Sequence, residues 1–258
     1  MAQWNKNEQD YRSQDKSLFE VVMIADQNGN PLNTYGSAAN IPIADGTVPG
    51  YSHINKFGYD EAVGTGAYET IWDGSSIYSY IGTPGVASVT SDDGGDTGNL
   101  IDIQGLDADY NLVTETIAVG STGTQVFSRV FRAICQTECV GEVDVDVDGA
   151  TRATILAGAG QTLMALYTVP AGKTAYLLKF QGSIDKSNGE AKFRLMVRPE
   201  GNGFQVKGQF GTAAGSYVTY DYPVPLKFEE KTDIEIRAIA GATLGCGATF
   251  DLILVDDA

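Results

Sequence analysis

The sequence is poor in the residues that most often carry chemistry, with one histidine, three cysteines and two tryptophans in 258 residues. His53 lies in a segment without a regular strand pattern, so a Ser-His-Asp or Cys-His site would have no evident scaffold. Cys135, Cys139 and Cys246 are too few for a disulfide framework, and we expect them to be reduced and mostly buried. A zinc site is unsupported because the Cys135-x-x-x-Cys139 pair lacks a second pair.

Other functional signatures are also missing. The sequence contains no GK[ST] motif, and no glycine cluster stands between a strand and a helix as in a phosphate-binding loop. The 33 acidic residues offer many pairs for glycoside hydrolysis, but the sequence singles out none of them. We therefore predict a protein that is not an enzyme, with no catalytic, cofactor-binding or metal-binding residues.

Basic residues are scarce as well. Lys and Arg number 17 against 33 Asp and Glu, giving a formal net charge of −16. Such a charge repels phosphate backbones, so nucleic acid is not an expected partner. No run of about 18 apolar residues occurs, which predicts no membrane-spanning helix. The N-terminal MAQWNKNEQDYRSQDK has no apolar core of a secretory signal, and we expect synthesis in a cytoplasm.

What the sequence does contain is typical of an all-β protein. Glycine is abundant at 31 residues, and short alternating runs bounded by turn residues recur from Glu69 onward. One series of predicted strands ends near Leu156, and a second follows the stretch AGAGQ. A spacing of about ten residues between turns predicts a sandwich or barrel, and no crossover helix separates the strands.

The first part of the chain follows a different pattern. Residues 18–25, LFEVVMIA, predict a strand, but the stretch up to about Tyr68 has few consecutive apolar residues. We predict two regions: an extended, mostly irregular N-terminal arm over residues 1–68 that becomes ordered against a partner, and a β-sandwich over residues 69–258. A disordered tail is the alternative for the arm.

Individual strands predict which faces are buried. In TDIEIRAIA, residues 232–240, one side of a half-buried strand would carry Ile234, Ile236, Ala238 and Ala240, and the other Asp233, Glu235, Arg237 and Ile239. FDLILV, residues 250–255, is apolar on both faces and predicts a central strand. Prolines are expected at strand ends, where no ladder hydrogen bond is lost: Pro170, Pro199, Pro223 and Pro225.

The stretch VGEVDVDVDGATRATI could be a calcium loop or a β-hairpin. Counting from Asp144, the twelfth position of a helix-loop-helix calcium site would need a glutamate and holds Ile155. Valines alternate with the acids, and Asp148-Gly149 is a favoured two-residue hairpin turn. We predict a hairpin with Asp144, Asp146 and Asp148 on its solvent face, and a weak surface cation site as the alternative.

Two further segments are open to more than one interpretation. The acidic, glycine-rich SDDGGDTGN at 91–99 could hold a hard cation, but a flexible loop between strands is the simpler interpretation. Aromatic side chains could form a sugar-stacking platform, although aromatics in strands more often belong to a core or a subunit interface: Trp72, Tyr78, Tyr80, Tyr217, Tyr220 and Tyr222.

Several segments resemble a family of virion structural proteins from tailed bacteriophages, many of them from marine and cyanobacterial hosts. The resemblance spans most of residues 55–256, in the order of the family, and rests on these segments: NKFGYDEAVGTGAYETIWDG (55–74), IDIQGLDADYNLVTETIAVG (101–120), FSRVFRA (127–133), LAGAGQTLMALYTVPAGKTAYL (156–177), LMVRPEG (195–201), PLKFEEKTDIEIRA (225–238) and FDLILVD (250–256). Residues 1–50 are covered less clearly.

The resemblance implies a β-sandwich of jelly-roll type that has no enzymatic role. It leads us to expect a cement or decoration protein on the capsid surface of a virion, bound to the major capsid protein through the arm and exposed strand edges. A homotrimer is expected by analogy with decoration proteins. The alternative is a tail or head-fibre component that binds host surface glycans through tyrosine and tryptophan side chains.

Overall fold

The computed structural model describes residues 40–257, and the strand predicted at residues 18–25 lies outside them. The described residues up to Val48 belong to one compact unit, and those from Pro49 onward belong to a second. In the first, helix α2 (Asn40–Ala44) is followed by a turn in which Oδ1 of Asp45 accepts hydrogen bonds from the N–H and the hydroxyl of Thr47, at 3.0 and 2.7 Å. No helix among the described residues is long and apolar enough to cross a membrane.

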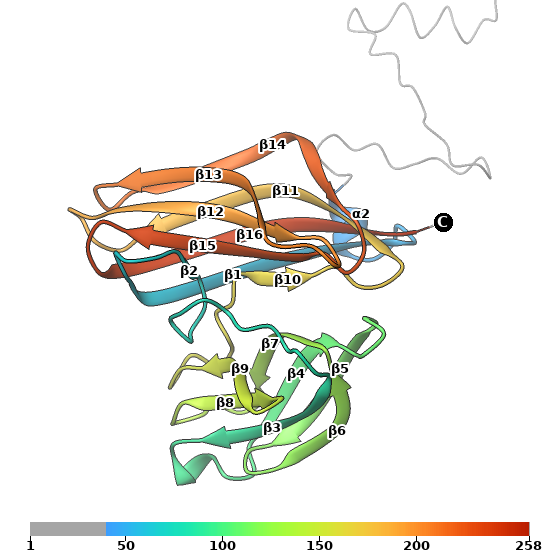
Figure 1. The fold of residues 1–258 in the computed structure, drawn as a ribbon. Coiled ribbons are helices and arrows are strands. Elements are labelled where there is room, and N and C mark those ends of the chain that lie inside the picture. The colour runs from blue at the N-terminus through green and yellow to red at the C-terminus, as the bar shows by residue number, and fades with distance from the viewer. Residues whose placement is uncertain (1–39, 258) are drawn as a thin grey trace, which may run out of the picture. The chain divides into compact units, whose positions relative to one another are not determined.

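The second unit is built around a sandwich of two antiparallel sheets, which confirms the predicted all-β class (Figure 1). Sheet A has the order β1 (Tyr51–Val63), β16 (Leu244–Asp256), β11 (Lys173–Ile184) and β14 (Tyr217–Phe228). Sheet B has the order β10 (Leu166–Thr168), β15 (Asp233–Ala240), β12 (Glu190–Arg198) and β13 (Gln205–Ala213). The short β2 (Glu69–Thr70) pairs with β15 as β10 does.

In the sandwich, strands that are early in the sequence pair with strands that are late in the sequence. Counting its strands along the chain from β1 as the first and β10 as the second to β16 as the eighth, sheet A reads first, eighth, third, sixth. Sheet B reads second, seventh, fourth, fifth. Successive strands therefore pass from one sheet to the other, except that the fourth and fifth form a hairpin in sheet B, and the first strand pairs with the last.

Residues 85–155 form a smaller β module, the insert, between β2 and β10 of the sandwich (green in Figure 1). One of its sheets contains β6 (Thr122–Phe127), β3 (Gly85–Ser91), β8 (Val143–Val147) and β9 (Ala150–Ile155). The other contains β5 (Leu112–Ala118), β4 (Leu100–Leu106) and β7 (Arg129–Cys135). The first predicted series of strands, apart from its first members before residue 85, corresponds to the insert. The second series corresponds to strands β10 to β16 of the sandwich.

The hairpin predicted within residues 140–155 is confirmed, with strands at Val143–Val147 and Ala150–Ile155. Its turn residues Asp148 and Gly149 have φ of +57° and +71°, the left-handed pair of a tight hairpin turn. The carboxylates of Asp144 and Asp146 accept hydrogen bonds from the hydroxyls of Thr154 and Thr151, at 2.7 and 2.8 Å. The intervening valines are buried, so the alternation of valine and aspartate separates the core face from the polar face.

Strand β1 corrects the prediction that the irregular arm extends to residue 68. It pairs with β16 from Tyr51 opposite Val255 to Val63 opposite Leu244. The strand escapes a pattern search because three of its buried positions hold Lys56, Gly58 and Asp60 rather than apolar residues. Gly58 is needed there, since an added Cβ would lie 2.4 Å from backbone atoms of two neighbouring segments.

Strand β16 meets the prediction for residues 250–255, because it lies centrally between β1 and β11. Its buried face carries Phe250, Leu252 and Leu254, whereas the other face is partly exposed. The proline prediction holds for Pro170 and Pro199, which follow β10 and β12, and is wrong for Pro223 and Pro225, which lie within β14. Both stand where the pairing of this edge strand with β11 is interrupted by a register shift, so again no ladder bond is lost.

Strand β15 corrects the prediction of a half-buried strand, because Asp233 and Glu235 are buried as completely as the apolar residues between them. Asp233 accepts hydrogen bonds from Nε of Arg129 in the insert and Nε of Arg198 in the sandwich, both at 2.8 Å. Tyr80 donates its hydroxyl to Glu235 at 3.0 Å. The second face of this part of β15 is thus covered by the segment that leads into the insert and by the insert itself.

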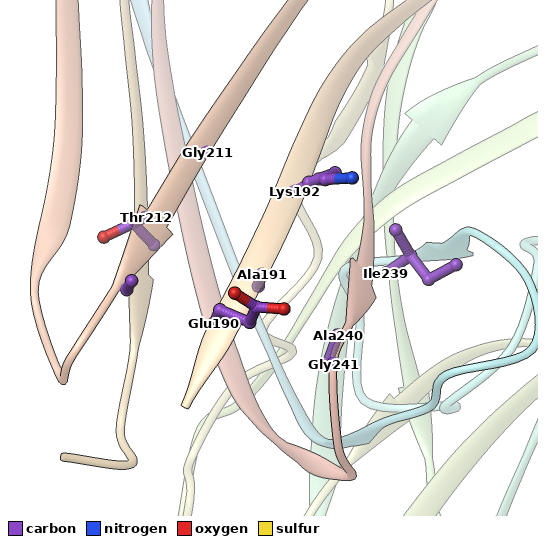
Figure 2. Close-up of a pocket in the computed structure, with 9 residues that line it drawn as sticks. Glu190, Ala191, Lys192, Gly211, Thr212, Ile239, Ala240 and Gly241 are labelled. Carbon is purple, nitrogen blue, oxygen red and sulfur yellow. The ribbon is translucent and has the colours of Figure 1, made fainter. Parts of the chain in front are cut away.

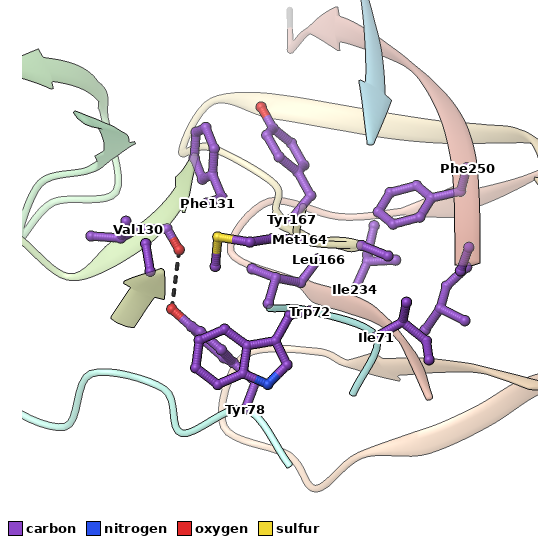
Figure 3. Close-up of a cluster of buried hydrophobic side chains, with 14 of the residues drawn as sticks. Ile71, Trp72, Tyr78, Val130, Phe131, Met164, Leu166, Tyr167, Ile234 and Phe250 are labelled. Carbon is purple, nitrogen blue, oxygen red and sulfur yellow. Dashed lines mark hydrogen bonds between the residues drawn. The ribbon is translucent and has the colours of Figure 1, made fainter. Parts of the chain in front are cut away.

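The insert and the sandwich share one hydrophobic core, drawn in Figure 3. Phe131 of the insert packs on Tyr167 of the sandwich with ring centroids 4.8 Å apart. Tyr78 lies edge-on to Trp72 at 5.1 Å and donates its hydroxyl to the Val130 carbonyl at 3.1 Å. Aromatic side chains of this size each bury roughly 150–250 Å², so this cluster fixes the insert on the sandwich.

We predict that Asp233→Asn lowers the free energy of unfolding by about 3 kcal/mol, because it leaves Arg129 and Arg198 without their counter-charge. The measurement is urea denaturation followed by circular dichroism. The matched control is Asp221→Asn on β14, where the side chain is 77% exposed and a surface ion pair contributes little. Equal, small effects for both variants would contradict the importance of the buried contact.

We predict that Gly149→Ala lowers the free energy of unfolding by about 1 kcal/mol, since a Cβ is strained at φ of +71° although it would meet no other atom within 4 Å. Gly66→Ala serves as the control, because Gly66 has equally open surroundings and no positive φ. The comparison isolates backbone strain from packing. A neutral Gly149→Ala variant would refute the assigned turn geometry.

Candidate assembly surface

The free edge of β13 is the part of the sandwich best suited to contact another chain. In the described residues, β13 pairs only with β12. Its sequence, QVKGQFGTA, contains two glycines and few apolar residues, and most of its side chains are partly or fully exposed. An edge strand with unpaired backbone groups is a template for an added strand. Val206, 48% exposed, adds an apolar contact at the start of the strand.

Strand β14 is the edge of the other sheet and follows β13 in the chain. It carries three exposed large apolar side chains, Tyr217, Tyr220 and Val224. Pro223 and Pro225 remove two backbone donors from this edge, which makes it less able to accept another strand. The two edge strands thus differ in the groups that they present to a partner: β13 presents backbone groups, and β14 presents apolar side chains.

Aromatic rings fill the space between these two edges. Phe180 stacks on Phe210 of β13 at 4.6 Å, Phe210 contacts Tyr220 of β14 at 5.5 Å, and Tyr220 meets Tyr222 edge-on at 4.8 Å. The Tyr222 hydroxyl is buried without a hydrogen-bond partner among the described residues. Burial raises the pKa of Tyr222. The row of rings keeps both edge strands in place while their outer sides face solvent.

A depression of about 380 Å³ lies beside the β13 edge, between β12, β13 and β15. Small residues make up much of its lining, among them Ala191, Gly211 and Gly241, and Figure 2 shows Lys192 and Ile239 beside them. Because β13 itself lines one side, a strand added at this edge would place a side chain close to the depression. The arrangement suits recognition of a polypeptide segment.

The predicted sugar-stacking platform is not formed as a single surface. Trp72 and Tyr78 are buried in the shared core, and Tyr80 is largely enclosed beside Glu235. The three tyrosines of β14, by contrast, lie on or near the surface at residues 217, 220 and 222. The six aromatic residues therefore divide into a core group and an edge group.

The acidic segment 91–99 uses its carboxylates to bind its own backbone. Asp96 accepts hydrogen bonds from the N–H groups of Val140 and Gly141, at 2.8 and 2.9 Å, and these bonds hold its pKa below the ordinary value. Asp93 caps the short 3₁₀ turn Gly94–Asp96 through the N–H of Gly95. The loop is therefore ordered by its acids.

The remaining singled-out residues are spread over the unit. His53 lies on β1 opposite Ile253, and its Nε2 is 3.2 Å from Oδ1 of Asp251, two residues along the paired strand β16. All three cysteines are free, Cys139 and Cys246 are buried, and Cys135 is partly exposed. Burial raises the pKa of Cys246 to about 12. The cysteine prediction is confirmed.

Sequence reasoning missed two kinds of residue. Lys56 is buried where it donates to the Phe131 carbonyl of the insert, and burial lowers its pKa. Nothing in the sequence separates it from an exposed lysine. The β13 edge was also missed, although glycine-interrupted strands with few apolar residues are typical of edges and could have indicated it.

The comparisons with known proteins give little. No protein-family model matches the chain, and no protein with a curated description matches it. Among solved structures, the chain is similar to one from "Structure of infectious bursal disease virus Gx strain", with 9% identity and a TM-score of 0.19. The match covers 80% of this chain and 75% of that chain. A similarity at this level carries no argument about fold or function.

We predict opposite effects for the loss of two tyrosine hydroxyls. Tyr222→Phe should raise the free energy of unfolding by up to about 1 kcal/mol, because it removes a buried hydroxyl without a partner. Tyr78→Phe should lower it by about 1 kcal/mol, because it removes the hydrogen bond to Val130. Thermal and urea unfolding measure both. A Tyr222→Phe variant as unstable as Tyr78→Phe would show that the Tyr222 hydroxyl is bonded.

Proposed function

We propose that this chain is a non-enzymatic structural protein of a tailed-phage virion, a cement or decoration protein that binds the outside of the capsid and stabilises contacts between major capsid protein subunits. The observation that carries the proposal is the pair of consecutive edge strands β13 and β14, one with unpaired backbone groups and the other with exposed apolar side chains. Such surfaces on an otherwise acidic chain fit an assembly contact.

The strand order of the sandwich is a second observation that supports the proposal. Two sheets with the first strand beside the eighth, and the second beside the seventh, have the order that arises when two Greek keys wind into a jelly roll. Jelly rolls form many viral capsid and lectin domains, and this is the architecture that the sequence resemblance implies. Fold alone does not define function, so the edge strands remain the main argument.

Such a protein would stabilise a capsid because many copies of it bind to the same shell. A contact at one β13 edge buries little surface, but many copies on one shell, each touching two shell subunits, would hold the lattice together through multivalency. The net charge of −16 keeps free copies apart before they bind. A homotrimer would add further valency, and it rests on analogy with decoration proteins.

The first test is the copy number of the protein in purified particles, measured against the major capsid protein by quantitative mass spectrometry. We expect copies within a small factor of the capsid protein. A few copies per particle would favour a tail or head-fibre component that binds host glycans, and complete absence would overturn the virion assignment.

The edge-strand contact is tested separately with Val206→Lys, which places a charge at the β13 edge. We expect its binding to particles that lack the protein to fall at least tenfold, because the lysine must lose water at an apolar contact. Leu112→Lys on β5 of the insert is the matched control, since Leu112 is 50% exposed and Val206 48%. Equal binding by Val206→Lys and wild type would exclude the β13 edge as the contact.

A further inference from the structure

A depression of about 460 Å³ lies where the insert meets the sandwich, and no residue of β13 or β14 lines it. The insert contributes Tyr110, Ser128 and Arg129 to its lining, and the sandwich contributes Arg198 and Lys231. Sites for small molecules often lie between structural modules, with volumes of about 300–1,000 Å³. The depression therefore has the position and the size of a small-molecule site.

Three cationic side chains line this depression, although the chain as a whole has a net charge of −16. Arg129 and Arg198 share a single carboxylate, that of Asp233. Nζ of Lys231 is 3.6 Å from Oε1 of Glu200, which is too far for a hydrogen bond. The lining thus holds three cations and two carboxylates, so that one positive charge is left over. A ligand with a single negative charge would balance it.

Two of these cations have donors that remain available to a ligand. Nε and Nη2 of Arg198 donate to Oδ2 of Asp233 at 2.8 and 2.6 Å, whereas Nη1 has no hydrogen-bond partner among residues 40–257. Nζ of Lys231 makes no hydrogen bond within the same residues. The two side chains are 28% and 27% exposed, so their donors are accessible from water. Guanidinium and ammonium groups are the usual partners of carboxylates and phosphates in proteins.

Two residues of the lining are held in a strained backbone conformation. Of the five non-glycine residues with positive φ in the described part of the chain, Tyr110 at +67° and Lys231 at +58° border this depression. The N–H of Lys231 donates to the Val169 carbonyl at 2.7 Å, and the Tyr110 carbonyl accepts from the N–H of Ala171 at 2.9 Å. Nζ of Lys231 lies 5.7 Å from the centroid of the Tyr110 ring. Strained residues of this kind are concentrated at active sites and ligand clamps.

We propose that this depression binds a sugar acid, a single pyranose ring that carries one carboxylate. The carboxylate lies against Nη1 of Arg198 and Nζ of Lys231, and its charge of −1 balances the excess charge of the lining. A phosphate ester, with a charge of about −1.5 to −2, would overcompensate it. The amide of Asn202 and the carboxylate of Glu200 are suited to the hydroxyl groups of a sugar. A purely apolar acid would leave these polar groups without partners.

The test is a titration of the full-length protein, followed by calorimetry, with D-glucuronate, D-glucose, acetate and inorganic phosphate as probes. We expect D-glucuronate to bind with Kd on the order of 1 mM, as is reasonable for a ligand of this size. D-glucose should bind at least tenfold more weakly because it lacks the carboxylate. Acetate and phosphate should also bind at least tenfold more weakly, because neither has the hydroxylated ring.

Lys231→Asn removes one cation from the depression and introduces a residue that tolerates positive φ. Because the partner Glu200 is 59% exposed, no buried charge is left unpaired and Tm should not change. We expect D-glucuronate to bind at least tenfold more weakly. The matched control is Lys227→Asn on β14, which removes the same charge and an ion pair with Glu229 but lies outside the depression. It should bind D-glucuronate as wild type does.

The proposal is overturned if wild type does not bind D-glucuronate, or if acetate or phosphate binds equally well. Equal weakening by the two lysine variants would also overturn it, because the overall charge would then explain the effect. Binding of an oligo-aspartate peptide without binding of D-glucuronate would show that the partner is an acidic protein segment instead. The inference goes beyond the proposed virion function and does not rest on it, since the titration needs no capsid.

Discussion

The contact between Asp233 and the two arginines is the interaction on which the arrangement of the β modules depends. A buried, ionised carboxylate is costly unless its oxygens are bonded. Here Arg129 comes from the insert and Arg198 from the sandwich, so the carboxylate is satisfied only when both modules are in place. The guanidinium groups also lie 5.2 and 4.3 Å from the ring centroid of Tyr80. The apolar core around Trp72 supplies most of the attraction, and the charged contact specifies its geometry.

Most of the strands could be predicted from the sequence because local patterns determine them. The alternation of valine and aspartate before Asp148-Gly149 predicted both the hairpin and its turn, which depend only on neighbours in the chain. Prediction failed where distant segments decide the environment. The buried residues of β1 include a lysine, a glycine and an aspartate that other strands accommodate. The buried Asp233 of β15 is paired with two arginines from other segments, and Arg129 is the more distant of the two in the sequence.

The candidate surface was less predictable than the fold for a related reason. Whether an aromatic residue is a platform or part of a core depends on what covers it, and the sequence does not contain that information: Trp72 is buried, whereas Tyr217 is exposed. Likewise, the acidic loop at 91–99 could not be told from a cation site until Asp96 was seen to bind backbone N–H groups.

The pairing of β1 with β16 has a consequence for how the protein is made. The first strand of the sandwich finds its partner only in the last strand of the described chain, which begins at Leu244. A ribosome must therefore release nearly the whole polypeptide before sheet A can close, while the insert, whose strands pair among neighbours in residues 85–155, can form earlier. Until then β1 is an unpaired strand, and Lys56 and Asp60, which are buried in the finished sandwich, are in contact with water. Charged side chains on an unpaired strand oppose edge-to-edge pairing with other chains, so the residues that are costly to bury in β1 suit the strand while it is still exposed.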